Sequence, residues 1–200
     1  MKKIIKYLFL LTGGSFILAS CNDFLDREPL DSVTPDNFFF TENDLAAYAV
    51  KHYNFTTHEG FNAGIWKNDN ATDNQAATDY DKKWIPGQWK VPEAYDNPAS
   101  NDPWYFSAIR EANYFLETVV PRFEKGEIEG SETNIKHYIG EMYFLRAKNY
   151  LSKLETFGDF PIIKNTLPDE SESLIQASKR APRYKVEHFI LEDLDQAISL

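Results

Sequence analysis

The spacing of apolar residues predicts a helical chain. Apolar side chains recur at three- and four-residue intervals in four stretches, which is the pattern of an amphipathic helix. The longest stripe runs from Ile135 to Phe157. The segment from Phe160 to Ile163 is short and contains Pro161, so it is at most an edge strand. We therefore expect helices over roughly 42–57, 103–123, 131–157 and from about 184 onward.

Capping residues mark the ends of two of these helices. Thr41, with Asp44 three residues later, fits an N-terminal capping box, although that box prefers Glu or Gln. Ser131 is expected to cap the longest helix. Gly158 is a natural C-cap for it, because the left-handed backbone at a helix end favours glycine.

Residues 58–102 lack helical periodicity and predict a long loop. Loops of this length are usually functional or disordered, and disordered segments are poor in aromatic residues. This one holds Phe61, Trp66, Tyr80, Trp84, Trp89 and Tyr95. We therefore expect an ordered, functional loop. Asp102 and Pro103 then fit the N-cap and first residue of the next helix, and 158–181 forms a second predicted loop.

The two helices at 103–123 and 131–157, joined by a short connection, predict a hairpin like a tetratricopeptide (TPR) unit. The expected fold is mainly α, with TPR-like helical hairpins of the α-α superhelix type and a long ordered aromatic-rich loop. A plain helical hairpin stays open, since one pair does not distinguish the two. The last apolar stripe continues to Leu200 without a cap, so we expect the N-terminal part of a longer protein.

The first twenty residues have the features of a secretory signal. Three lysines precede an apolar stretch that is too short and too interrupted to span a bilayer. Leu18-Ala19-Ser20-Cys21 matches a bacterial lipobox, in which the cysteine is acylated and the chain is cut before it. The alternative is an ordinary signal peptide with a cysteine nearby by chance. The expected organisation is a signal peptide at 1–20, a lipidated tether at 21–40 that starts to pack at 38–40, and a helical domain at 41–200.

Composition and charge exclude several classes of function. Of the 200 residues, 42% are hydrophobic and 26% charged, which is ordinary globular usage and argues against a disordered chain. The net charge is −10, so nucleic acid is not an expected partner. Residues 1–20 hold three lysines and no acid, so the chain without them has 18 basic and 31 acidic residues and a net charge of −13. We therefore expect only the lipid to contact the membrane. The single cysteine excludes an intrachain disulfide and a cysteine-based zinc cluster.

Four motifs follow one another along the chain. They are the lipobox with Cys21-Asn22-Asp23-Phe24-Leu25-Asp26; Trp104-Tyr105 with Ile109, Arg110 and Asn113; Gly140-Glu141 with Phe144-Leu145-Arg146-Ala147, Tyr150, Leu154 and Phe157-Gly158; and Arg183, Val186, Ile190 and Asp193-Leu194. In this order they resemble the N-terminal part of the SusD/RagB family of nutrient-binding lipoproteins. The third motif is the most specific, with Met142 where the family usually has Ala. The resemblance covers nearly all of 21–200.

The resemblance implies a function and a partner. Members of this family are TPR-like helical lipoproteins of the outer-membrane surface that capture oligosaccharides for polysaccharide utilisation, and they are not enzymes. They work with a SusC-like TonB-dependent transporter. The resemblance therefore implies an oligosaccharide ligand, an outer-membrane location and a transporter partner. A lipid-anchored helical scaffold, a binder of peptide or another nutrient, and a surface hydrolase stay open as alternatives.

Candidate ligand contacts lie in the aromatic-rich loop. Sugars present flat C–H faces and a rim of hydroxyls, which proteins meet with aromatic rings and with Asn, Asp, Gln or Arg. The 58–102 loop has that composition, and Trp84 and Trp89 flank Pro86-Gly87, which could present both rings on a turn. The expected ligand contacts are Trp84, Tyr80, Asn74, Trp89 and Asp81. Trp66 is expected in the core instead.

Structural roles are expected for the residues of the helical motifs. Arg146 lies on the apolar face of its helix with Glu141 near it, and a buried Arg needs a partner. We expect a structural ion pair or a snorkelling side chain there. Asn113 is expected to tie its helix to a neighbouring backbone, and Trp104 to pack in the core.

No catalytic or metal-binding pattern stands out. The four histidines are scattered without metal-ligand spacing, and among 31 acids no pair is singled out for glycoside hydrolysis. No known glycine-rich phosphate loop is present. The segment 68–73 resembles part of a calcium loop but lacks the required glycine. We expect no catalytic residue, no metal and no cofactor, with calcium as the one alternative left open.

Overall fold

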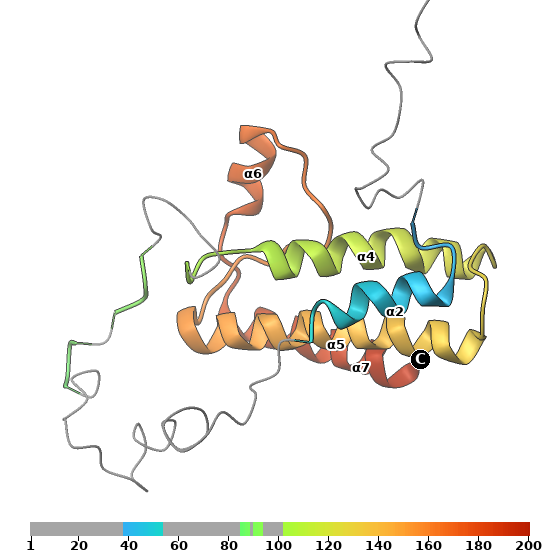
Figure 1. The fold of residues 1–200 in the computed structure, drawn as a ribbon. Helices are drawn as coiled ribbons and strands as arrows, with labels where there is room; N and C mark the ends of the chain where they lie inside the picture. The colour runs from blue at the N-terminus through green and yellow to red at the C-terminus, as the bar shows by residue number, and fades with distance from the viewer. Residues whose placement is uncertain (1–37, 54–84, 89, 94–101) are drawn as a thin grey trace, which may run out of the picture. The chain divides into compact units, whose positions relative to one another are not determined.

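The computed structural model describes residues 38–53, 85–88, 90–93 and 102–200. These residues form helices and connecting segments, and within them β-pairing is limited to two isolated bridges. The fold is mainly α, as the apolar spacing predicted (Figure 1). The helices are α2 (Glu42–Val50), α4 (Ser107–Glu124), α5 (Glu132–Phe157), α6 (Ser171–Ala177) and α7 (Arg183–Ser199).

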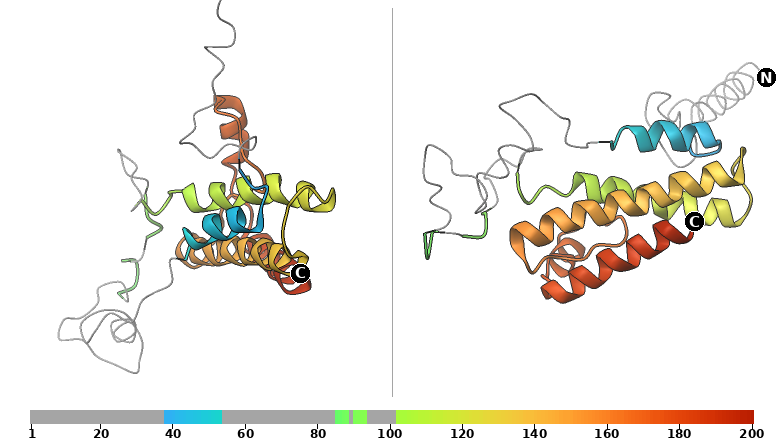
Figure 2. Two further views of the ribbon diagram at one scale, coloured as in Figure 1. Left: turned by 45° about the vertical axis from the view of Figure 1, so that its right-hand side comes forward. Right: turned by 90° about the horizontal axis from the view of Figure 1, so that it is seen from below.

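Helix α5 is the central element of the described residues, because it packs against α2, α4 and α7 (Figures 1 and 2). Helices α4 and α5 form the expected hairpin, joined by a short turn in which Gly126 has a φ of 70°. Gly140 lets α5 approach α7 closely, since a Cβ atom there would lie 3.1 Å from the carbonyl oxygen of Ala197. The glycine of the third motif therefore has a packing role.

Two apolar clusters lie along α5. The first surrounds its N-terminal half and joins it to α2 and α4, with Phe39, Leu45, Phe115 and Met142 fully buried. The second surrounds its C-terminal half and joins it to α7; its buried members are Ile109, Ala147, Tyr150, Phe157, Phe160, Val186, Phe189 and Ile190. Burial of one such large side chain stabilises a fold by about 1.5–3 kcal/mol, so these clusters hold the helices together.

Helix α2 is fixed at its N-terminus. The Thr41 hydroxyl accepts the backbone N–H of Asp44 and the Asp44 carboxylate accepts the backbone N–H of Thr41, which forms the predicted capping box. The Glu42 N–H donates to the Glu129 carbonyl at 2.8 Å, and the Glu129 N–H donates to the Phe40 carbonyl at 2.7 Å. The start of α2 is therefore attached to the α4–α5 turn.

Two helix boundaries and one helix cap differ from those predicted. Helix α2 ends at Val50 rather than 57, and the next turn is tighter, with i to i−3 bonds; residues 54–57 lie outside the described part. Asp102 and Pro103 do not open α4, because Asp102 closes a turn in which its carboxylate accepts the Trp104 N–H at 2.8 Å. Ser131 occupies the N-cap of α5, but its side chain does not cap the helix, and its N–H donates to the Glu42 carboxylate instead.

Helix α6 lies within the predicted loop 158–181 and was not expected. It spans only seven residues and buries none of them, so it leaves no apolar stripe in the sequence. Its Leu174 and Ile175 side chains are exposed. Within the described residues, no helix combines the length and the apolar character needed to cross a membrane.

Candidate functional site

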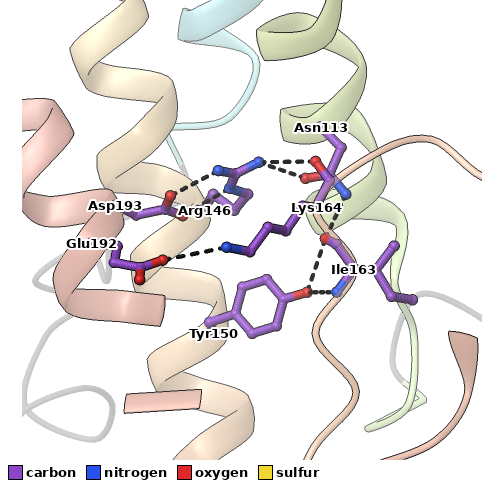
Figure 3. Close-up of polar contacts among 7 residues, drawn as sticks. All are labelled: Asn113, Arg146, Tyr150, Ile163, Lys164, Glu192 and Asp193. Carbon is purple, nitrogen blue, oxygen red and sulfur yellow. Dashed lines mark hydrogen bonds and ion pairs between the residues drawn. The ribbon is translucent and has the colours of Figure 1, made fainter. Parts of the chain in front are cut away.

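The candidate site is built around the segment that connects α5 to α6, residues 159–170, which we call the connecting segment. A group of buried polar side chains, which we call the polar clamp, holds this segment against the helices (Figure 3). The clamp consists of Asn113 on α4, Arg146 on α5 and Asp193 on α7. It therefore links three helices and the connecting segment at one point.

Arg146 is the centre of the polar clamp. Its Nε and Nη2 atoms donate to the two carboxylate oxygens of Asp193, each at 2.7 Å. Its Nη1 atom donates to the Asn113 side-chain oxygen at 2.9 Å and to the Lys164 carbonyl at 3.3 Å. A bidentate pair of this kind is a strong, directional interaction that fixes the relative positions of α5 and α7.

The clamp also holds the backbone of the connecting segment. The Asn113 side-chain amide donates to the Ile163 carbonyl at 2.8 Å and to the Asn165 carbonyl at 3.3 Å. The Tyr150 hydroxyl donates to the Ile163 carbonyl at 3.1 Å and accepts the Ile163 N–H at 2.8 Å. The buried polar atoms thus satisfy one another, which is the condition for a stable polar network.

Burial sets the electrostatics of the clamp. Asp193 is 3% exposed and Arg146 6% exposed. Burial raises the pKa of Asp193, and the hydrogen bonds and charge of Arg146 act in the opposite direction. Burial also raises the pKa of Tyr150 to about 12, so its hydroxyl stays protonated and keeps donating at neutral pH.

A pocket of about 470 Å³ opens between α4, the connecting segment and α6, and we call it the α4 pocket. Its walls are mainly apolar, and Arg110, Asn165 and Asp169 supply polar groups. The size and composition are typical of sites that hold small organic ligands. Its lining residues are Phe106, Ile109, Arg110, Asn113, Ile163, Asn165, Leu167, Pro168, Asp169 and Leu174.

The α4 pocket and the polar clamp share Asn113 and the backbone of the connecting segment. Arg110 adds a bond from its Nη1 atom to the Leu167 carbonyl at 3.4 Å. The clamp therefore fixes the connecting segment relative to α4, and so sets the width of the α4 pocket in the absence of a ligand. A pocket with an aromatic ring, an amide, a carboxylate and a guanidinium has the groups that sugars require.

Glu141 does not pair with Arg146. Its carboxylate accepts the Tyr53 hydroxyl at 2.7 Å and lies 3.0 Å from the His137 Nε2 atom. Burial and this bond raise the pKa of Tyr53 to about 12. The acid nearest to Arg146 in sequence thus fixes the end of the 38–53 segment instead, and the acid that pairs with Arg146 comes from a different helix.

The predicted ligand contacts and the lipidation site lie outside the described residues. These are Trp84, Tyr80, Asn74, Trp89, Asp81 and Cys21, and Trp66 and the possible calcium segment 68–73 are also outside. Between the two tryptophans, Ile85 to Gln88 form a turn in which Gly87 has a φ of 80°. The predicted turn at Pro86-Gly87 is therefore present.

Trp104 packs on the second apolar cluster. Its ring centroid lies 4.1 Å from that of Phe157, and its indole N–H donates to the Pro92 carbonyl at 2.8 Å. This hydrogen bond ties residues 90–93 to the helical body. Trp104 therefore joins the predicted loop to the core.

Sequence reasoning missed Asp193, Tyr150 and the connecting segment as parts of one site. Asp193 lies 47 residues after Arg146, so the two are brought together only by the packing of α5 on α7. One signal was available, because Asp193 sits between apolar residues on the buried face of its helix. Among the described residues, no group of three or more His, Cys, Asp or Glu side chains could hold a metal ion.

Comparison with known proteins identifies the family and a solved structure with a similar fold. Residues 23–200 match the SusD-like family described as "Starch-binding associating with outer membrane". A SusD-like protein from Bacteroides fragilis has a similar structure, with a TM-score of 0.53 and 24% identity over 86% of this chain and 32% of that chain. That likeness concerns the fold alone.

Two curated relatives come from Formosa agariphila. SusD-like protein P2 is 26% identical over 90% of this chain, and SusD-like protein P38 is 27% identical over 96%. The chain spans 35% and 36% of their lengths, about a third. The molecule is thus a helical protein of the TPR-like class. The chain belongs to the SusD-like family, as the four motifs indicated.

Proposed function

We propose that the chain belongs to a cell-surface lipoprotein that binds oligosaccharides and delivers them to a SusC-like TonB-dependent transporter in the outer membrane. The protein holds the sugar without breaking it. Lipid on Cys21 attaches it to the membrane, and the helical hairpins contact the transporter. The observation that carries this proposal is the match of residues 23–200 to a family described as starch-binding and associating with the outer membrane.

The α4 pocket supports the binding part of this proposal. Its apolar wall, which includes Phe106, suits the C–H face of a sugar ring. Arg110 donates hydrogen bonds, Asp169 accepts them, and Asn165 does both, which suits sugar hydroxyls. The polar clamp holds the connecting segment in place, so little conformational freedom is lost when a sugar binds.

Affinity electrophoresis against a panel of polysaccharides tests the proposal. The protein lacks only residues 1–20 and carries Cys21→Ser, which keeps it in solution. Retardation by at least one glycan, with no release of reducing sugar, is the expected result. A protein that no glycan retards, or one that shortens the glycan, would contradict the proposal.

Two variants on α6 test the α4 pocket. Leu174 lines the pocket, whereas its neighbour Ile175 does not, and both are exposed, so neither change disturbs the core. Leu174→Glu places a charged group at the pocket and should weaken retardation, and Ile175→Glu should leave it unchanged. Equal behaviour of the two variants would place the sugar elsewhere, and loss of binding in Trp84→Ala would then favour the 58–102 loop.

The transporter partnership needs a separate test. Protein captured from detergent-solubilised outer membranes should bring a TonB-dependent transporter with it, identified by mass spectrometry. A lipoprotein of similar size from the same membrane serves as the control. Recovery of the protein without a transporter would contradict the delivery step and leave sugar binding untouched.

A further inference from the structure

A second pocket lies beside the connecting segment, on the side of α7. Successive residues of the segment alternate between the two pockets: Ile163 and Asn165 line the α4 pocket, whereas Ile162 and Lys164 line the second. This alternation is what extended backbone produces. We call the second site the α7 pocket, and its volume is about 370 Å³.

The α7 pocket combines rings with positive charge. Both Phe189 and Tyr184 line it, and Phe189 is 4% exposed whereas Tyr184 is 63% exposed. Lys164 and Lys185 supply two ammonium groups, and Glu192 supplies the one carboxylate in the lining. His188 completes the polar side chains of the pocket.

The charge of Lys164 is held in place. Its carbonyl accepts a hydrogen bond from Arg146, so the polar clamp fixes its backbone. Its ammonium lies 4.8 Å from the centroid of the Phe189 ring and 3.3 Å from the Glu192 carboxylate. The ammonium therefore lies over the inner wall of the pocket, where a cation gains from the face of an aromatic ring.

Lys185 supplies a charge that the pocket does not neutralise. It forms no ion pair within the part of the chain that the structure describes, since the Glu192 carboxylate already faces Lys164 and His188. The lining thus carries a positive surplus on a chain whose net charge is −10. An anionic group would form an ion pair with this surplus charge, whereas a neutral sugar could only accept hydrogen bonds from it.

We propose that the α7 pocket binds an acidic sugar unit, with its carboxylate or sulfate group at Lys164 and Lys185 and its ring on the Tyr184 face. This inference rests on the proposed function and names the substrate class: an anionic rather than a neutral glycan. The α7 pocket thus adds a subsite for anionic groups to the mainly apolar α4 pocket on the other side of the connecting segment.

Calorimetric titration with two saccharides of equal length tests the inference. The acidic probe is trigalacturonate and the neutral probe is maltotriose, added to protein without residues 1–20 and with Cys21→Ser. The acidic probe should bind more tightly, and its advantage should shrink at high salt, because salt screens exposed charges. Trisulfated trisaccharide as a third probe separates a general anion preference from a carboxylate preference; tighter binding of either anion supports the inference.

Two variants change the charge of the α7 pocket in opposite directions, and a third serves as the control. Lys185→Gln should weaken binding of the acidic probe about threefold, and Glu192→Gln should strengthen it by a similar factor, in line with the energies of exposed ion pairs. Neither should change binding of the neutral probe. Lys136→Gln removes the same charge from the far end of α5, where Lys136 pairs with Glu132, and should leave both probes unchanged.

The outcomes separate the inference from the proposed function. Binding of glycans from the panel with no charge preference, and with Lys185→Gln and Glu192→Gln both silent, overturns the inference and leaves the proposed function standing. Failure of every glycan in the panel overturns both. An equal loss in Lys185→Gln and Lys136→Gln overturns the inference as well, because the effect would then belong to the net charge.

Discussion

The polar clamp shows what one side chain can specify. Arg146 donates from its Nε and Nη2 atoms to Asp193 on α7, and from its Nη1 atom to both Asn113 on α4 and the backbone of the connecting segment. A buried ion pair gives little net stability over an apolar replacement, but it defines which groups must meet. The clamp therefore sets the register of α5 against α7 more than it adds to the total free energy of folding.

Removing one partner of the clamp should be costly. Asp193→Ala leaves the Arg146 guanidinium buried without its main acceptor, and we expect the free energy of unfolding to fall by about 3–5 kcal/mol. Urea denaturation followed by circular dichroism measures this. The double variant Arg146→Met with Asp193→Leu is the control and should be more stable than Asp193→Ala alone. A loss below about 1 kcal/mol in the single variant would mean that water replaces the carboxylate.

His52 gives the folded state a dependence on pH. Its Nε2 atom is buried without a hydrogen bond and lies 3.4 Å from the Glu111 carboxylate. Burial lowers the pKa of His52. The negative charge of Glu111 acts in the opposite direction, and the positive charge of Lys51 lowers the pKa further. The unfolded chain therefore binds the proton more readily than the folded one, and stability present above pH 6.5 is lost as the pH falls below it.

The measurement compares urea midpoints at pH 7.5 and pH 5.5. The wild-type protein should lose stability between these values, and His52→Gln should lose less. His188→Gln is the matched control, because His188 is exposed and its replacement should keep the wild-type slope. If the urea midpoint of His52→Gln falls between pH 7.5 and pH 5.5 by as much as that of the wild type, another group causes the pH dependence.

Single-residue roles could be predicted from the sequence only where a local pattern fixes them. The capping box of Thr41 and Asp44 involves only the four residues 41–44 and is present. The partner of Arg146 depends on which face α7 presents to α5, which no local pattern states. Glu141 therefore looked like the available acid, although Asp193 is the one that packing brings to Arg146.

At the scale of elements, periodicity predicted each helix in the described part of the chain that buries a stripe. Helices α4, α5 and α7 each bury residues along one face, and all three were predicted. Helix α6 buries none and was missed. The start of α4 was placed too early because Asp102 and Pro103 satisfy the local rules of a helix start. The Trp104 ring packs on Phe157 just before α4, and the tight turn at Asp102 precedes that contact.

The α5–α7 crossing depends on Gly140. Valine has a slightly better helix propensity than glycine, but its side chain would press on the Ala197 carbonyl oxygen, which lies only 3.1 Å from the position of a Cβ atom at residue 140. We expect Gly140→Val to lower the free energy of unfolding by about 1–3 kcal/mol, the usual cost of overpacking. Chemical denaturation measures this loss.

The control for Gly140→Val introduces valine where no neighbouring helix crowds it. Ser152→Val places the same β-branched side chain on an exposed position of α5. Serine and valine have similar helix propensities, so the control should stay within about 0.5 kcal/mol of the wild type. Equal losses in both variants would show that the close approach of α7 is unimportant.

At the scale of the whole molecule, charge and attachment are separate properties. The chain has a net charge of −10, and anionic lipid surfaces attract clusters of Lys and Arg rather than acidic surfaces. Within the described residues no helix could span a membrane. Under the proposed function, lipid at Cys21 attaches the protein to the membrane, and more than one acyl chain is needed for this attachment to be stable.

Replacing this cysteine should release the protein. We expect wild-type protein to sediment with outer membranes and to enter the detergent phase on phase separation, and Cys21→Ser to stay in the aqueous phase. Ser20→Ala is the matched control, because it keeps a small residue before the cysteine and should remain membrane-bound. A Cys21→Ser protein that still sediments can be washed with high salt. Release by salt would indicate retention by a protein partner through charge, whereas resistance to both salt and the substitution would place the anchor outside Cys21 and overturn the lipobox prediction.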